Sequence, residues 1–143
     1  MDWNYYNTFI TVAPDCPVQF GTMPPAKKDG MSKHGIEYDL VAEHPYEYTQ
    51  EELLFQVHIR HKAIPADELK LCDAELRQAF FNKPKACLRA SMLSKKFGWG
   101  IHFNAEGKLA LVPMESPEYN RLLENGDGTL QIVSAMRNKS KNR

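Results

Sequence analysis

The chain has 143 residues, and its 18 Lys and Arg balance its 18 Asp and Glu, so the formal net charge is zero. This balance argues against a dedicated nucleic-acid or acidic-membrane binder, which needs a basic surface. The hydrophobic share of 43% and the charged share of 25% are typical of a soluble globular protein, and the length predicts a single domain.

The N-terminus and the cysteines predict the compartment. The first residues, MDWNYYN, lack the apolar core of a secretory signal, and no apolar run reaches transmembrane length. Cys16, Cys72 and Cys87 are odd in number, widely spaced and form no CxxC pair. We therefore expect a cytoplasmic protein with reduced thiols and no membrane contact.

The chain opens with a strand and a long irregular segment. Residues 8–12 (TFITV) are β-branched and aromatic, which favours a strand that ends before Pro14. The segment Gly21–Gly35 is rich in Pro, Gly and Lys. Loops of this length are often functional or disordered, so this one is interpreted either as a lid over a site or as a surface loop.

Three helices are predicted next. Ile36, Leu40 and Val41 share one side of a short helix that ends near His44, because Pro45 disfavours helical backbone before it. Thr49 and Glu52 match a capping box and open a helix to about residue 62, although the alternation from residue 55 to residue 60 also suits a strand. Apolar residues spaced by three and four predict an amphipathic helix over residues 66–82.

The segment from residue 97 to residue 112 predicts a β-hairpin. Trp99, Ile101 and Phe103 fall on one face of its first strand, and Gly98, Gly100 and His102 fall on the other. Residues 104–107 (NAEG) form the turn, and residues 108–112 form a return strand covered on both faces. Residues 86–91 also alternate, which predicts a further strand.

The C-terminal part predicts a helix, a strand and a tail. Ser116 and Pro117 are helix-start signals, residues 129–133 favour a last strand, and residues 137–143 (RNKSKNR) predict a basic, frayed tail. Because helices are grouped rather than alternating with strands, the expected fold class is α+β. We expect a mainly antiparallel sheet of about four strands with helices on one face, in a single domain over residues 1–136.

The small residues of the hairpin suggest a candidate ligand site. Glycine inside a strand marks a bulge or the close approach of another group. Gly98, Gly100 and Ala110 would leave room above the sheet, either for packed protein groups or for a ligand. In the ligand interpretation the candidate binding residues are Arg89, Lys95, Lys96, Trp99 and His102, with the basic side chains holding an anion.

Other candidate chemistry is incomplete. His58 and His61 have a spacing that can ligate zinc, but no acid or cysteine clearly completes a site, so a solvated helix face and no metal are expected. Cys87 has basic neighbours that would lower its thiol pKa, yet a buried core thiol is the default. Ser91 with His102 shows no nucleophile elbow. There is no Walker loop, Rossmann fingerprint or paired-carboxylate pattern, so no cofactor is expected.

Five short segments spread over nearly the whole chain carry a resemblance: residues 4–10 (NYYNTFI), 13–17 (APDCP), 44–46 (HPY), 87–91 (CLRAS) and 97–102 (FGWGIH). With these segments the sequence resembles a small family of bacterial proteins described only as a domain of unknown function. Met92 and Phe97 stand where the family pattern has Pro and Tyr. The resemblance implies a single bacterial domain and carries over no functional residue.

A second resemblance is architectural. Residues 107–111 (GKLAL), followed by a Ser-Pro-Glu helix start at residue 116, are similar to the MmcQ/YjbR-like α+β proteins, some of which are thought to bind DNA. This likeness concerns the fold alone.

Three functional hypotheses remain. The first is a cytoplasmic binding or interaction protein without catalysis, because no catalytic constellation is complete. The second is a small enzyme or anion-ligand binder that uses the face of Gly98, Gly100 and His102. The third is a nucleic-acid binder that uses Lys95, Lys96 and the tail, and the neutral net charge disfavours it. The expected partner is therefore a small anionic ligand or another protein.

Overall fold

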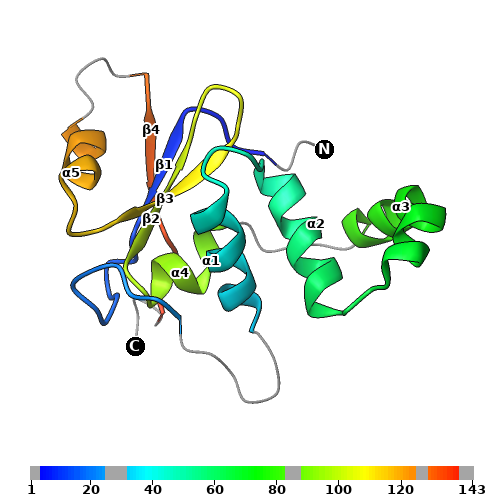
Figure 1. Ribbon diagram of the computed structural model, residues 1–143. Helices are drawn as coiled ribbons and strands as arrows, with labels where there is room; N and C mark the ends of the chain where they lie inside the picture. The colour runs from blue at the N-terminus through cyan, green and yellow to red at the C-terminus, as the bar shows by residue number, and fades with distance from the viewer. Residues whose placement is uncertain (1–3, 25–31, 83–87, 125–128, 139–143) are drawn as a thin grey trace.

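A computed structural model describes residues 4–24, 32–82, 88–124 and 129–138. Figure 1 shows one sheet in the middle of the molecule, with helices on both sides of it. Within the described residues, no helix is both long and apolar enough to cross a membrane. The arrangement is the α+β class that the sequence predicts.

The sheet has four strands in the order β3-β2-β1-β4. The strands are β1 (Thr8–Thr11), β2 (Trp99–Phe103), β3 (Leu109–Pro113) and β4 (Gln131–Ser134). The pair β2–β3 is the predicted antiparallel hairpin, and β1–β2 is also antiparallel, but β1 and β4 are parallel. The sheet is therefore mixed, because the chain crosses over from β3 and returns to the far edge in the direction of β1.

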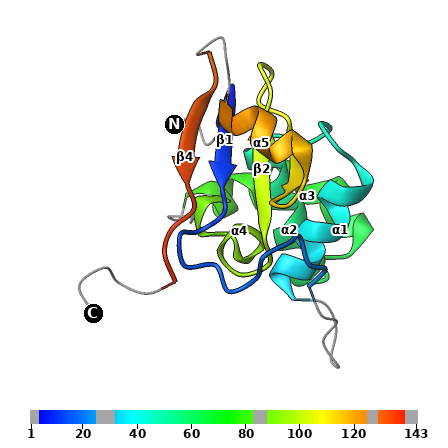
Figure 2. The same cartoon turned by 90° about the vertical axis from the view of Figure 1, so that its left-hand side faces the viewer.

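The helix α5 (Pro117–Glu124) makes this crossover. Figure 2, which turns the left-hand side of Figure 1 toward the viewer, shows α5 lying in front of the sheet. The expectation that helices cover only one face is therefore wrong. The physical reason is that β1, β2 and β3 carry apolar or small residues on both faces, so the second face also needs a cover. Phe9, Val112 and Tyr119 form that second buried cluster.

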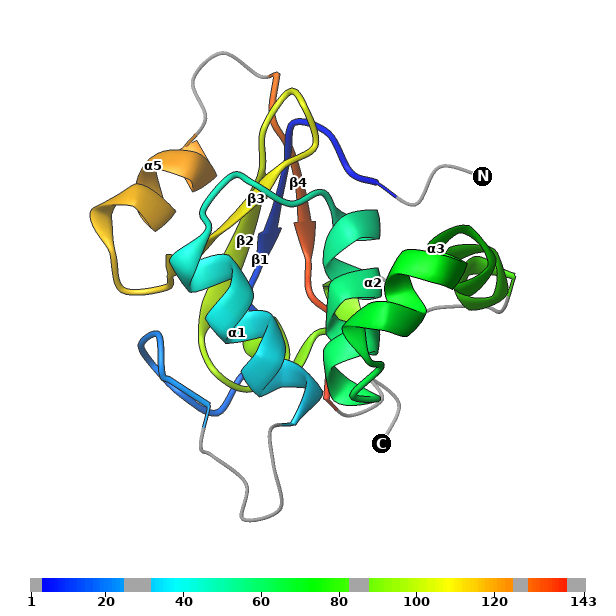
Figure 3. The ribbon, with the colours of Figure 1, turned by 45° about the vertical axis from the view of Figure 1, so that its right-hand side comes forward.

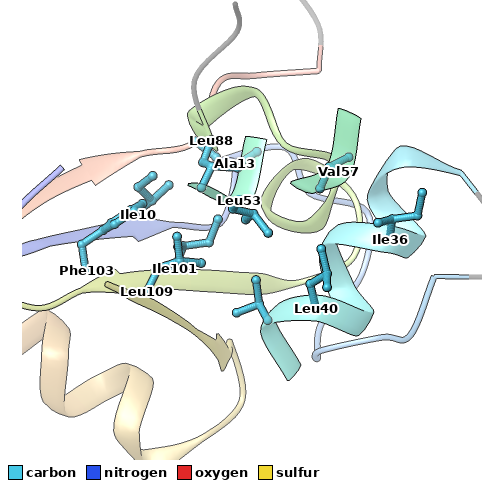
Figure 4. Close-up of a cluster of buried hydrophobic side chains, with 12 residues drawn as sticks. Ile10, Ala13, Ile36, Leu40, Leu53, Val57, Leu88, Ile101, Phe103 and Leu109 are labelled. Atoms are coloured by element: carbon cyan, nitrogen blue, oxygen red, sulfur yellow. The ribbon is translucent and has the colours of Figure 1, made fainter. Parts of the chain in front are cut away.

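The first face is covered by α1 (Lys33–Glu43) and α2 (Gln50–His61), which lie beside each other in Figure 3. Their inward side chains join those of the strands in the main core, most of which Figure 4 labels. This core consists of Ile10, Ala13, Ile36, Leu40, Val41, Leu53, Val57, Leu88, Ile101, Phe103, Leu109 and Ala135. The alternation within β2 decides the division, since Ile101 and Phe103 face α1 and α2 while Gly100 faces α5.

The capping box at the start of α2 is confirmed. The Thr49 hydroxyl accepts a hydrogen bond from the Glu52 amide at 3.2 Å, and the Glu52 carboxylate accepts from the Thr49 amide at 3.1 Å. The cap resolves the ambiguity over residues 55–60 in favour of a helix, because it satisfies backbone donors that only a helix start leaves open. Phe55, Val57 and Ile59 are all buried within the helix.

The helix α3 (Ala66–Phe81) is confirmed, but it has no buried residue. Figure 1 and Figure 3 both show it as the element farthest from the sheet. It contacts α2 through Phe80 and Phe81, whose ring centres lie 5.8 and 6.4 Å from that of Phe55. Leu71 is 83% exposed, and the backbone at Cys72 departs from helical geometry.

The strand predicted over residues 86–91 is wrong for the residues that the structure describes. Leu88–Ala90 forms a single 3-10 turn, η1, and Ser91 caps the short helix α4 (Met92–Lys95). The Ser91 hydroxyl accepts from the Leu93 amide, so a polar side chain starts a helix where alternation favoured a strand. Residues 83–87, including Cys87, lie outside the described residues.

The remaining connections agree in part with the sequence. Gly107 adopts a φ of 80°, and the Asn104 side chain accepts from the amides of Glu106 and Lys108, which closes the predicted turn. The segment predicted as irregular over residues 21–35 ends earlier, because Ser32 caps α1. Residues 25–31 lie outside the described residues, so the choice between a lid and a surface loop stays open.

Candidate functional site

The candidate residues of the hairpin do not converge on one place. Trp99 faces α1, where its indole donates to the carbonyl of Thr22 at 2.8 Å and its ring lies 5.4 Å from that of Tyr38. His102 faces α5 on the opposite side of the sheet, as the alternation within β2 requires. One ligand therefore does not touch both side chains from one face.

The room expected above the two glycines is occupied by protein groups. A Cβ atom added to Gly100 would lie 2.8 Å from the Phe9 ring and 2.9 Å from the Tyr119 ring. At Gly98, where φ is 80°, it would lie 2.5 Å from the carbonyl oxygen of Phe20. The packing interpretation therefore accounts for both glycines.

His102 instead pairs with Tyr46. The Tyr46 hydroxyl lies 2.9 Å from His102 Nδ1, and the two rings meet edge to face with centres 5.7 Å apart. Burial lowers the pKa of the His102 imidazole, and the negative charge of Glu118 opposes this effect. Burial, and then the same Glu118 charge, raise the pKa of the Tyr46 phenol. The pair links the loop before α2 to the sheet.

The basic candidates, Arg89, Lys95 and Lys96, lie near the end of the sheet where β4 ends. Arg89 Nε donates to the carbonyl of Ser134 at 2.8 Å, which ties η1 to β4. The backbone carbonyl of Lys95 accepts from the Asn138 side chain at 2.8 Å, and Lys96 is exposed. Asn138 also donates from its backbone to Asp15, so the chain is anchored as far as residue 138. Arg89 thus already has a structural partner.

A cavity of about 270 Å³ lies elsewhere, between α1, α2, the end of α3, and the segment of η1 and α4. We call it the Glu37 pocket. Its apolar lining is Leu54, Val57, Phe80, Leu88, Ala90 and Met92. Its polar lining is Lys33, His34, Glu37, His58 and Ser91. Leu88 and Val57, both labelled in Figure 4, belong to the main core as well, so the pocket borders that core.

Glu37 and Ser91 form the polar centre of this pocket. The Ser91 hydroxyl donates to Glu37 Oε1 at 2.7 Å, a length typical of a hydrogen bond to a charged acceptor. The same hydroxyl accepts from the Leu93 amide at 3.2 Å, which fixes its direction. The helix α1 supplies the acid and the start of α4 supplies the hydroxyl, so the pair exists only in the folded chain.

The protonation of Glu37 is unusual. Burial raises the pKa of its carboxyl from 4.5 to about 7, while the Ser91 hydrogen bond and the charge of Lys33 act in the opposite direction. The desolvation of the carboxylate is therefore only partly offset. A carboxyl that titrates near neutral pH in a cavity can exchange a proton or bind a cation under ordinary conditions.

Two histidines complete the polar lining. The His34 ring lies 5.2 Å from the Phe97 ring, and the His58 ring lies 4.6 Å from the Phe80 ring. His58 thus faces the pocket, whereas His61 is exposed at the end of α2. Among the described residues, no group of three or more His, Cys, Asp or Glu could hold a metal ion.

Sequence reasoning missed Glu37 and its pairing with Ser91. The two residues lie 54 positions apart, and no motif joins them. One signal was present: Glu37 precedes Leu40 by three residues and Val41 by four, which places it on the apolar side of its helix. An acid on that side needs a buried partner or a function.

Comparison with known proteins gives a family whose function is unknown. No curated protein and no solved structure matches the chain. A family model described as a family of unknown function (DUF6157) matches residues 1–141. The match spans nearly the whole sequence, in agreement with the resemblance seen in the sequence. The chain therefore belongs to this family of unknown function, DUF6157.

Proposed function

We propose that the protein binds a small organic molecule in the Glu37 pocket and acts as a binding protein. The observation that carries the proposal is the Glu37 carboxyl, which lies beside the cavity, receives the Ser91 hydroxyl on one oxygen and has a pKa raised to about 7. A buried acid is costly for the fold unless something compensates it. Strongly perturbed pKa values in clefts cluster at functional sites.

The composition of the pocket supports a ligand of mixed character. Six apolar residues line it, and their contacts favour a hydrocarbon body. The polar residues come from both helices and from the start of α4, so they can orient that body. Pockets that bind small molecules commonly combine an apolar lining with a few placed polar groups.

The test is a fragment screen followed by protein NMR. Proton–nitrogen correlation spectra are recorded with a library of small fragments at millimolar concentration. We expect hits that shift the amides of residues 33–37 and 88–92, and that lose these shifts in Ala90→Phe or Leu54→Trp, which fill the pocket and leave Glu37 in place. Ala74→Phe on the exposed side of α3 is the control and keeps the shifts. The proposal is contradicted if no fragment moves those amides or if the blocking variants retain the shifts.

A second candidate is a small enzyme in the same pocket. One observation favours it: a carboxyl with a pKa near 7 is well matched to general acid–base catalysis at neutral pH. Ser91 would then position Glu37. A turnover that disappears in Glu37→Gln but not in Ala74→Phe would support the enzyme. Binding of the native ligand without chemical change would support the binding protein.

The expected setting is also a proposal. A cytoplasmic location is supported by the free thiols of Cys16 and Cys72, and a bacterial origin by the resemblance described above. The likeness to MmcQ/YjbR proteins, and the DNA binding it suggests, would predict affinity that falls steeply with salt. The check is to measure the affinity for duplex DNA at low and at high salt. Binding that is present at low salt and lost at high salt would support DNA binding.

A further inference from the structure

We infer that the ligand of the Glu37 pocket carries a protonated amine on a short apolar body, with the amine placed against the Glu37 carboxylate. This inference rests on the proposed function, because it names the class of molecule that the same pocket takes. It is argued from the hydrogen bonds, the missing ion pair and the lining of the pocket.

Within the described part of the chain, no charged group forms an ion pair with Glu37. Four ion pairs within 4.0 Å occur among the described residues, and none of them includes Glu37. Ser91 supplies a hydrogen bond but no charge, and it reaches only Oε1. Buried carboxylates are ordinarily paired, because the low polarity around them penalises an isolated charge. A cation that enters the cavity would supply the missing partner.

Lys33 does not fill this role. Its charge lowers the pKa of Glu37, but the effect is smaller than that of burial, and the Lys33 residue is exposed at the first position of α1. Lys33 lines the pocket, but among the described residues it forms no ion pair with Glu37 within 4.0 Å, and its exposed position leaves its charge screened by solvent. An ammonium group inside the cavity would act at short range and in drier surroundings.

The size and lining set the rest of the ligand. A dry cavity of about 150 Å³ is known to accommodate benzene, so about 270 Å³ leaves room for an amine with a short carbon chain or one ring. Leu54, Val57 and Met92 offer contacts to such a body. Lys33, His34 and His58 line the pocket around Glu37, but an anionic group placed next to Glu37 itself would meet the carboxylate and be repelled.

Three probes of similar size test which charge the pocket prefers in its ligand. Butylamine, butanol and butyrate are titrated at pH 7.5 into the wild-type chain and into Glu37→Gln, whose amide oxygen still accepts from Ser91. Binding is followed by the amide shifts of residues 33–37 and 88–92. We expect butylamine to bind roughly tenfold more tightly than butanol, with butyrate weakest. In Glu37→Gln we expect the affinity for butylamine to fall to the affinity for butanol.

The outcomes separate this inference from the proposed function. One outcome is that butanol or butyrate binds as tightly as butylamine while Ala90→Phe still abolishes binding. That result would support a binding site in the Glu37 pocket and refute the inference that its ligand is an amine. If no probe shifts the pocket amides, and the fragment screen also finds no hit, both are refuted. An amine preference that survives in Glu37→Gln also refutes the inference, since Glu37 would then not be the recognising group.

Proton release gives an independent readout. Among the described residues, the titratable groups that line the pocket with Glu37 are Lys33 and His34 on its own helix and His58 on α2. The segment of η1 and α4 contributes the Ser91 hydroxyl, and α3 contributes the Phe80 ring. At pH 6 most Glu37 carboxyls carry a proton, so amine binding releases close to one proton, and at pH 8 it releases almost none. Calorimetry in buffers of different ionisation enthalpy measures this release. In Glu37→Gln the release disappears, whereas release from a histidine would persist and contradict the inference.

Discussion

The two sides of the sheet differ in how completely they are filled. On the α5 side, the Phe9 and Tyr119 rings press against Gly100 closely enough that even a methyl group would collide with them. On the side of α1 and α2, a pocket of about 270 Å³ remains, with a partly buried acid at its wall. The α5 side, where the glycines suggested room for a ligand, is filled by protein. The pocket lies on the side of α1 and α2, where the sequence predicts only amphipathic helices.

This difference shows what small residues in a strand signify here. Gly100 is small because two aromatic rings occupy the space that its side chain would take. The open space arises instead where α1, α2 and the irregular η1 and α4 segment meet without fitting together fully. Only the folded chain shows such a mismatch, because no single segment contains it.

The largest expected effect tests whether the α5 side is closed. Phe9 is 0% exposed, so Phe9→Ala removes a whole ring from a filled cluster. We expect it to lower the free energy of unfolding by about 3–5 kcal/mol. Urea denaturation measures the change. Phe20→Ala, at a residue that is 57% exposed, is the control and should change stability by less than about 0.5 kcal/mol. Equal effects would contradict the comparison.

The next effect tests the buried acid on the other side. The unfolded chain loses the Glu37 proton near pH 4.5, whereas the folded chain keeps it until about pH 7. Because the folded state binds more protons in this window, its stability falls as the pH rises from 4.5 to 7 and then levels off. The contribution is at most about 3–4 kcal/mol, since each pKa unit corresponds to about 1.36 kcal/mol.

Denaturation of the wild-type chain and of Glu37→Gln at several pH values checks this prediction. The variant keeps a hydrogen-bond acceptor for Ser91 and has no proton to lose, so its stability should decline less across the window. Parallel pH profiles for the two proteins would show that Glu37 titrates normally, and the pocket would then lack its distinctive group.

A substitution at Gly100 sharpens the comparison further. The added Cβ of Gly100→Ala would lie 2.8–2.9 Å from ring atoms of Phe9 and Tyr119. We expect a loss of about 1–3 kcal/mol in the free energy of unfolding, as for other overpacked cores. In a Tyr119→Leu background the loss should be smaller, because the narrower side chain can move aside. A cost that is the same in both backgrounds would assign the strain to the backbone instead.

The smallest effect concerns the helix that forms one wall of the pocket. Thr49→Ala removes the side-chain cap of α2, which carries Leu54, Val57 and His58. We expect a loss of about 1 kcal/mol in stability, measured by thermal or urea denaturation. Thr49→Ser keeps the hydroxyl and should retain most of the stability. If Thr49→Ala and Thr49→Ser lose the same amount, the cap is not what stabilises this end.

The sequence predicted those parts of the fold that depend on local rules. The capping box at Thr49, the turn at Gly107 and the proline start of α5 each involve residues within a few positions of one another, so local chemistry determines them. The parallel pairing of β4 with β1 was missed, because it depends on where a crossover places the chain. The 3-10 turn at Leu88–Ala90 was missed because alternation over a few residues also fits a strand.

The candidate site was less accessible to sequence reasoning. Alternation correctly placed Trp99 and His102 on opposite faces, but nothing in the sequence showed that Phe9 and Tyr119 fill the space beside Gly100. Glu37 meets Ser91 only because α1 packs against the start of α4. The one local signal was an acid on the apolar side of α1, and its meaning depends on a partner 54 residues away.

The most direct test of the account is the pKa of Glu37 itself. Carbon-13 NMR of the glutamate carboxyls, titrated from pH 3 to pH 9 and assigned by comparison with Glu37→Gln, measures it. We expect a value of about 7, raised by burial of the carboxyl, and a further rise in Ser91→Ala, where the stabilising hydrogen bond is lost. A value near 4.5 that does not respond to Ser91→Ala would contradict the buried acid and, with it, the proposed pocket.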